Sequence, residues 1–170
     1  YGRLNNRPGV ALATSGPGAA NLLTGIGNCY FDSVPAIFIT GQVNINEQKG
    51  EKPTRQIGFQ ETDIVGMAAP VTKKAYAVRS ARDLPSVLEE AFQIAISGRP
   101  GPVLIDIPMN VQNEETELYT PASDLLKSKP DHENTDSFFR DYLNALEKSK
   151  RPLVLIGRGI RASGSAGQFL

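Results

Sequence analysis

Ala13-Thr14-Ser15-Gly16-Pro17-Gly18-Ala19-Ala20-Asn21 is the stretch that decides the fold of this chain. It follows the short apolar run 10–13, which is typical of a buried strand. After it, Leu22, Ile26 and Tyr30 recur at helical spacing, so one helix face can lie on a sheet. The order of strand, turn and helix predicts an α/β protein.

The turn itself has the features of a ligand platform. Gly16 and Gly18 allow backbone angles and close approaches that a side chain would block, and Pro17 stiffens the chain between them. A helix that begins here would expose its first amides. The pattern matches neither G-x-G-x-x-G nor the P-loop. A ligand site and a turn without a ligand therefore stay equally open at this point.

Further along the chain, short apolar runs alternate with helical patterns. Strands are predicted at 36–40, 74–78 and 103–108, with a short helix at 59–67 and an amphipathic helix that starts at Leu84 after a cap at Ser80 or Asp83. Residues 44–58 are expected to form an exposed loop. This alternation predicts an open, mostly parallel, doubly wound sheet with helices on both faces.

In such a sheet, ligands lie beyond the carboxyl ends of the strands. The glycine turn, Gly41-Gln42 and Pro108-Met109 all follow predicted strands, so we expect them at one edge. The amides of Gln42 and Gln60 could bind a heterocycle there or simply make loop hydrogen bonds. Asp106 is either a site residue or a packing residue.

The chain divides by composition into three parts. Residues 1–112 form the first domain, 113–135 read as a polar linker, and 136–170 start a second α/β domain. In that second part, 152–156 is predicted as a strand, followed by a turn at Gly157-Arg158-Gly159. Because the chain begins at Tyr1 and ends within a predicted helix, we expect it to be a piece of a longer protein.

Composition excludes several classes of function. The 170 residues carry 18 basic and 18 acidic side chains, which gives no basic excess for nucleic acid, and no apolar run is long enough to span a membrane. Cys29 is the only cysteine, which fits a cytoplasmic setting. His132 is the only histidine and lies in the linker, so neither a zinc site nor a Ser-His-Asp triad is expected.

Five segments together resemble the thiamine-diphosphate-dependent enzymes, most closely the acetolactate (acetohydroxyacid) synthase branch. They are the glycine turn with Leu22, Asp32-Ser33-Val34-Pro35, Thr40-Gly41-Gln42-Val43, Phe59-Gln60-Glu61, and residues 97–108 with the sequence SGRPGPVLIDIP. They follow one another in the family's order over residues 1–110.

The resemblance implies that the first domain binds the pyrimidine ring of thiamine diphosphate. Its residues on the cofactor side would be Gly16, Pro17, Gly18, Asn21, Gln42 and Gln60. Ser33 and Arg99 match positions that approach FAD in flavin-containing members, while Phe59 and Lys73 match positions near the substrate. The Mg²⁺ site of the family belongs to another domain, so no metal ligand is assigned here.

The implied reaction is decarboxylation of pyruvate followed by addition of the two-carbon unit to a second 2-keto acid. The family's catalytic glutamate precedes the segment that matches this chain, so no residue here takes its role, and the piece alone is expected to be inactive. The resemblance implies a homodimer or homotetramer. Another 2-keto acid decarboxylase of the same family and a non-catalytic assembly module remain as alternatives.

One departure from the family pattern concerns the segment between Gln42 and Phe59. Residues 43–58 are longer and more charged than is usual in the synthases, and Asn44 stands where a proline is common. Because this segment borders the expected site, the choice of 2-keto acid and the need for flavin stay open.

Overall fold

The protein was studied as a computed structural model, which describes residues 1–5, 7–117 and 136–169. It forms two compact units, residues 1–129 and 130–170, and each is considered by itself. Most of the predicted linker, with His132, lies outside the described residues. The predicted domain boundaries stay predictions.

A four-stranded, fully parallel sheet forms the centre of the first unit. Its strands are β1 (Gly9–Ala13), β2 (Ala36–Gln42), β3 (Lys74–Ala77) and β4 (Pro102–Pro108), in the order β1-β2-β4-β3. The two central strands are the two continuous apolar runs, because only a central strand is covered on both faces. The predicted parallel sheet is confirmed.

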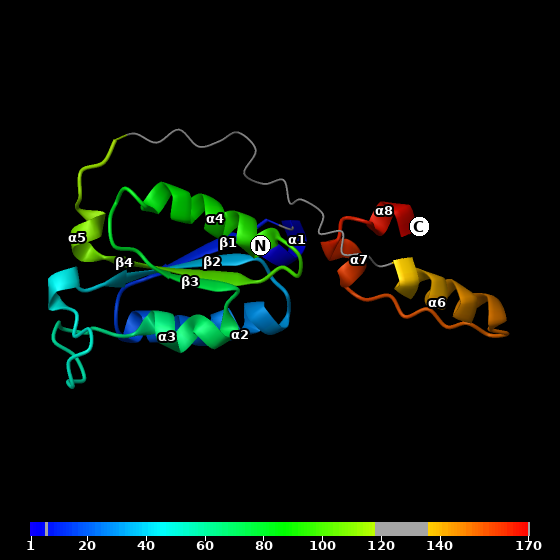
Figure 1. The fold of residues 1–170 in the computed structure, drawn as a ribbon, viewed down its shortest axis with the longest axis horizontal. Coiled ribbons are helices and arrows are strands. Elements are labelled where there is room, and N and C mark those ends of the chain that lie inside the picture. The colour runs from blue at the N-terminus through cyan, green and yellow to red at the C-terminus, as the bar shows by residue number, and fades with distance from the viewer. Residues whose placement is uncertain (6, 118–135, 170) are drawn as a thin grey trace. The chain divides into compact units, whose positions relative to one another are not determined.

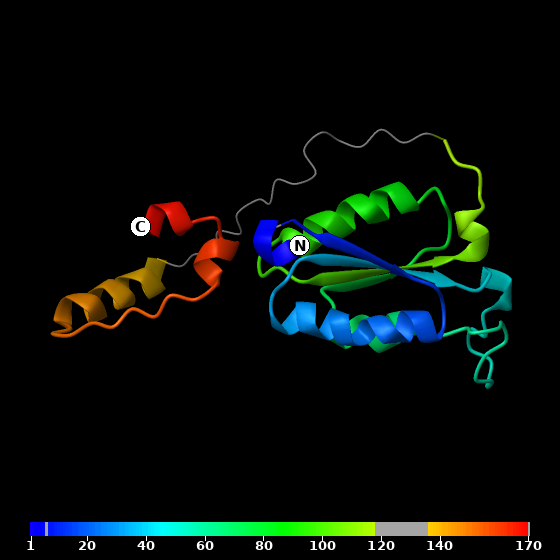
Figure 2. The ribbon, with the colours of Figure 1, turned by 180° about the vertical axis from the view of Figure 1, so that it is seen from behind.

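Helices cover both faces of this sheet, as Figures 1 and 2 show from opposite sides. On one face, α2 (Pro17–Phe31) and α3 (Ile64–Ala68) pack in a core that includes Ile26, Phe38 and Leu104. On the other face, α4 (Leu84–Ile96) packs in a core that includes Ala91 and Ile105. The sheet thus separates two hydrophobic clusters, as the doubly wound interpretation predicts.

Short helices complete the first unit. They are α1 (Gly2–Asn5), η1 (Ile45–Glu47), η2 (Ala69–Val71) and α5 (Met109–Gln112). The sequence predicted only an exposed loop in 44–58, so η1 is an addition there. Among the described residues, no helix is long and apolar enough to cross a membrane.

The helix predicted over 59–67 was wrong in its first half, because α3 starts only at Ile64. Gln60 has a φ of 62°, which no helix can include. Asp63 then caps the helix through its carboxylate, which accepts the Gly66 N–H at 2.9 Å. The predicted start of α4 is confirmed, since the helix begins at Leu84 with Asp83 at the cap position, although the Asp83 side chain makes no cap hydrogen bond.

The second unit contains α6 (Asp136–Lys148), α7 (Gly159–Ala162) and α8 (Ala166–Phe169). The strand predicted at 152–156 was wrong: those residues form no regular secondary structure, and Leu153 and Leu155 are 94% and 95% exposed. A strand requires hydrogen-bonded neighbours. Residues 136–169 contain no other strand to supply them.

Candidate functional site at the carboxyl edge of the sheet

The carboxyl ends of three strands meet at one edge of the sheet. In the register of the parallel ladder, Ala13 pairs with Thr40, and Thr40 pairs with Asp106. Two residues later Gln42 pairs with Pro108. The glycine turn, Gly41-Gln42 and Pro108-Met109 therefore lie at the same edge, as expected.

Gly16 and Gln60 make a close contact at this edge. A Cβ placed on Gly16 would lie 2.7 Å from the Gln60 Cβ and 3.0 Å from its carbonyl oxygen. Gly16 has a φ of 63° and Gln60 a φ of 62°, so both backbones occupy the left-handed region. Only glycine at position 16 permits this approach, which brings a residue from the 43–63 connection directly onto the turn.

Helix α2 starts without a side-chain cap, because its cap residue is Gly16. Pro17 is the first helical residue and has no N–H, and the first intrahelical bond runs from Ala20 N–H to the Gly16 carbonyl. The amides of Gly18 and Ala19 therefore lack helical partners. Pro17 and Asn21 are exposed beside them, and the half-buried Gln60 amide has no hydrogen-bond partner within the part of the chain that the structure describes.

The Gln42 side chain is oriented inward by three hydrogen bonds. Its Nε2 donates to the Thr62 carbonyl at 2.7 Å and to the Asp106 carboxylate at 3.0 Å, and its Oε1 accepts the Val43 N–H at 3.0 Å. Gln42 is 8% exposed. In this arrangement the amide holds the connection rather than facing a ligand, although its assignment to the cofactor side stays a prediction.

Asp106 is the buried carboxyl of this edge. Thr40 Oγ1 donates to it at 2.6 Å and Gln42 Nε2 at 3.0 Å. Burial raises its pKa to about 6, and these two hydrogen bonds only partly oppose the effect. Its contacts support the packing role that the sequence left open, and Thr40, which the sequence did not single out, is its closest partner.

Three of the predicted residues, Lys73, Arg99 and Ser33, lie at the opposite, amino edge of the sheet. Lys73 precedes β3, and its backbone N–H donates to the carbonyl of Pro102 at the start of β4. Its ammonium donates to the carbonyls of Ser97, at 2.6 Å, and Ile94, and to the Ser97 hydroxyl at 3.2 Å. Lys73 thus caps the end of α4, and burial lowers its pKa.

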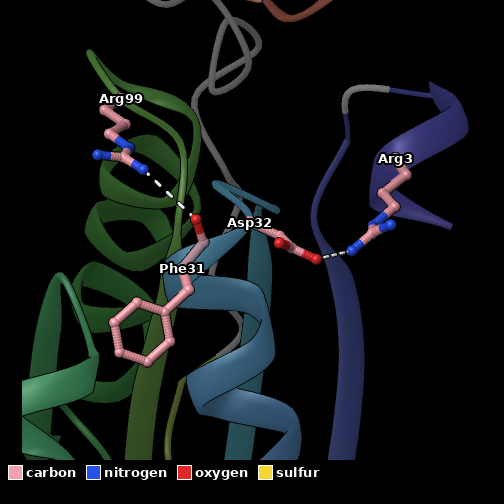
Figure 3. Close-up of polar contacts among 4 residues, drawn as sticks. All are labelled: Arg3, Phe31, Asp32 and Arg99. Atoms are coloured by element: carbon pink, nitrogen blue, oxygen red, sulfur yellow. Dashed lines mark hydrogen bonds and ion pairs between the residues drawn. The ribbon is translucent and has the colours of Figure 1, made fainter. Parts of the chain in front are cut away.

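Arg99 and Ser33 also meet at this edge. Arg99 Nε donates to the Ser33 hydroxyl at 2.7 Å, and its Nη2 reaches the Phe31 carbonyl at 3.4 Å. Figure 3 shows Arg99 at the end of α2, with Arg3 paired to Asp32 on the other side. A pocket of about 570 Å³ lies here, lined by Tyr30, Phe31, Thr72, Lys73, Arg99, Pro100 and Gly101.

The structure therefore separates the two residues assigned to the substrate. Phe59, which is 82% exposed, adjoins Gln60 at the carboxyl edge, whereas Lys73 lies at the amino edge. Nothing within the first unit brings them together. No three His, Cys, Asp or Glu side chains in residues 1–5, 7–117 and 136–169 could hold a metal ion. Cys29 is half-buried in α2, and burial raises its pKa, which disfavours the nucleophilic thiolate.

Comparison with known proteins agrees with this geometry. Residues 1–67 match the family described as thiamine pyrophosphate enzyme, N-terminal TPP binding domain. The chain is 41% identical over 170 residues to the acetolactate synthase large subunit of Lactococcus lactis, covering 99% of this chain and 28% of that protein. It is 39% identical over 180 residues to the chloroplastic acetolactate synthase of Arabidopsis thaliana, covering 100% and 25%.

The large subunit of Corynebacterium glutamicum is 41% identical over 161 residues, which covers 94% of this chain and 25% of that protein. The chain thus spans about a quarter of the length of the curated relatives that it matches, and the similarity extends over both of its units. Residues 1–67 thus match the N-terminal TPP binding domain of thiamine pyrophosphate enzymes, and the chain as a whole is similar to a fragment of the acetolactate synthase large subunits.

Proposed function

We propose that the chain forms the pyrimidine-binding side of an enzyme that decarboxylates pyruvate and joins the two-carbon unit to a second 2-keto acid. The observation that carries the proposal is the identity of about 40% to acetolactate synthases along the whole chain. The contact between Gly16 and Gln60 at the carboxyl edge supports it, because that edge is where open α/β sheets bind ligands.

The residues at the glycine turn fit the aminopyrimidine of thiamine diphosphate. The free amides of Gly18 and Ala19 and the unpartnered amide of Gln60 offer donors and an acceptor to a heterocycle. Pro17 and Asn21 are exposed beside them. When bound, the cofactor supplies the carbanion stabilisation that decarboxylation requires.

This chain's own contribution is to bind and orient the ring. Gly16 allows the Gln60 backbone to approach the turn. This approach brings the side-chain amide of Gln60, which belongs to the 43–63 connection, to the proposed ring site. Gln42 and Asp106 hold the start of that connection against the sheet. Phe59 adjoins this group and is exposed, which suits contact with the 2-keto acid.

A second group, FAD, would approach the amino edge. The pocket there combines the rings of Tyr30 and Phe31 with the guanidinium of Arg99, and these residues fit a flat, anionic ligand. Ser33 would act by orienting Arg99. Lys73 lines the same pocket with its ammonium bound to α4, so its proposed part in substrate entry would operate from this side.

Magnesium is proposed to be bound by another domain of the full-length protein, as the resemblance implies. No step of the proposal runs through it. We further propose a homodimer or homotetramer, as the resemblance implies, and a cytoplasmic setting, which the single cysteine fits. A monomeric sedimentation profile for the full-length protein would count against this part of the proposal.

Incubation of the full-length protein with pyruvate, thiamine diphosphate and Mg²⁺ tests the proposed function. Cofactor-dependent acetolactate is the expected product. Pyruvate loss that yields only acetaldehyde would assign the protein to the decarboxylases instead. No turnover, together with no thermal shift on adding the cofactor, would favour a non-catalytic assembly module.

A further inference from the structure

The connection between β2 and α3, residues 43–63, is anchored at both of its ends. At the start, Gln42 binds Asp106 and the Val43 N–H. Near the end, the same Gln42 amide donates to the Thr62 carbonyl. One buried side chain therefore ties the two ends of the connection to each other and to the sheet.

A glycine contact closes the connection further out. Gly58 lies against Val43, where an added Cβ would stand 2.9 Å from the valine Cβ and Cγ1. Its N–H donates to the Glu47 carbonyl at 2.8 Å. The outgoing and returning halves of the connection are thus in direct contact just before Phe59.

Beyond this contact, residues 49–57 form an exposed excursion that is closed by Glu61. One carboxylate oxygen of Glu61 accepts the Lys49 N–H at 2.6 Å, and the other accepts the Ile57 N–H at 2.7 Å. Hydrogen bonds of this length to an ionised carboxylate are among the stronger ones in proteins. Both ends of the excursion are therefore held by a single side chain.

The excursion and the site are linked through neighbouring residues in the chain. Phe59 and Gln60 lie between Gly58 and Glu61, and the Glu61 N–H donates to the Gly58 carbonyl at 3.2 Å. Gln60 holds a left-handed conformation with a φ of 62°. A non-glycine residue persists in this region when its surroundings over-determine it.

We propose that Glu61 is a positioning residue that holds Phe59 and Gln60 against the glycine turn by closing the 49–57 excursion. It acts through its two bonds to backbone amides and not by touching the cofactor or the substrate. The inference rests on the proposed function, because it assigns Gln60 to the cofactor. Through Glu61, the charged segment 43–58 helps to position Phe59 and Gln60.

Three variants of the full-length protein test this assignment. Glu61→Gln keeps the shape but replaces one acceptor oxygen by an NH₂ group, which cannot accept from a backbone amide. Glu61→Asp keeps the carboxylate on a shorter stem. Glu51→Gln removes the same charge from the exposed part of the excursion, where Glu51 makes no bond with any described residue.

Hydrogen exchange of the peptide spanning residues 48–60 measures the closure directly. We expect exchange at Lys49 and Ile57 to be about tenfold faster in Glu61→Gln, intermediate in Glu61→Asp, and unchanged in Glu51→Gln. Unchanged protection in Glu61→Gln would overturn the proposal.

Calorimetric titration with thiamine diphosphate measures the positioning. The dissociation constant should rise about fivefold or more in Glu61→Gln and stay at the wild-type value in Glu51→Gln. Faster exchange with an unchanged dissociation constant would overturn the positioning role. A wild-type protein that does not bind the cofactor would overturn the proposed function and the positioning role alike, while the exchange result would still decide whether Glu61 closes the excursion.

Discussion

At the scale of single residues, Asp106 shows how the fold sets the chemistry of one group. Its carboxyl is 5% exposed and lies between Thr40 and Gln42, and burial raises its pKa from 3.8 to about 6. Between pH 3.8 and about pH 6, the folded protein keeps a proton on Asp106 that the unfolded chain releases. The stabilisation from this group is therefore complete below about pH 4 and is lost as the pH rises through 6.

Asp106→Asn should remove this dependence, because the amide does not titrate. We compare the free energy of unfolding of the variant with that of wild type at each pH. This difference should shift in favour of the variant by on the order of 3 kcal/mol from about pH 4 to about pH 7. Urea denaturation across this range measures the difference. Asp83→Asn, at an exposed carboxylate, is the control, and parallel profiles for wild type and Asp106→Asn would contradict the prediction.

The contact between Gly16 and Gln60 shows what single residues in the sequence could not reveal. The glycine turn was recognisable because it lies between a strand pattern and a helix pattern. Its partner was not, because Gln60 reaches the turn from a distant connection and in a left-handed conformation that propensity does not favour. The inward orientation of Gln42 was likewise hidden, since it depends on Asp106 and Thr62.

At the scale of elements, the strands that were correctly predicted are those with partners. Residues 36–40 and 103–108 are apolar runs that pair with each other in the middle of the sheet. Residues 152–156 are a run of the same kind, but no strand exists within 136–169 to pair with them, so they stay unpaired and exposed. Local patterns indicate the preference for a strand, while tertiary neighbours decide whether it forms.

Helix α4 is stabilised at its end by Lys73, a residue that the sequence-based prediction assigned only to the substrate. The Lys73 ammonium binds carbonyls in the last turn of this helix, where a cation also complements the helix dipole. Lys73→Met should therefore lower the free energy of unfolding by about 1–2 kcal/mol.

Urea denaturation of Lys73→Met beside Lys52→Met measures this effect. Lys52 is exposed and makes no side-chain hydrogen bond or ion pair with described residues, so its substitution should leave stability within about 0.5 kcal/mol of wild type. Equal stability of both variants would assign Lys73 to the ligand pocket alone.

At the scale of the whole molecule, the predicted site residues lie at two edges of the sheet rather than at one. The carboxyl edge carries the glycine turn, Gln60 and Phe59, while the amino edge carries Ser33, Lys73 and Arg99 around a pocket. The sequence predicted most of these residues through the resemblance, but it could not show that they divide between the edges. That division follows from the strand order and the parallel register.

The central claim is that the carboxyl edge binds thiamine diphosphate through Gln60. Calorimetric titration of the full-length protein carrying Gln60→Met tests it most directly, with Gln56→Met, at an exposed residue of the neighbouring excursion, as the control. Loss of the amide's hydrogen bonds should raise the dissociation constant about three- to tenfold in Gln60→Met and leave it unchanged in Gln56→Met. Equal affinities for the two variants would contradict the claim.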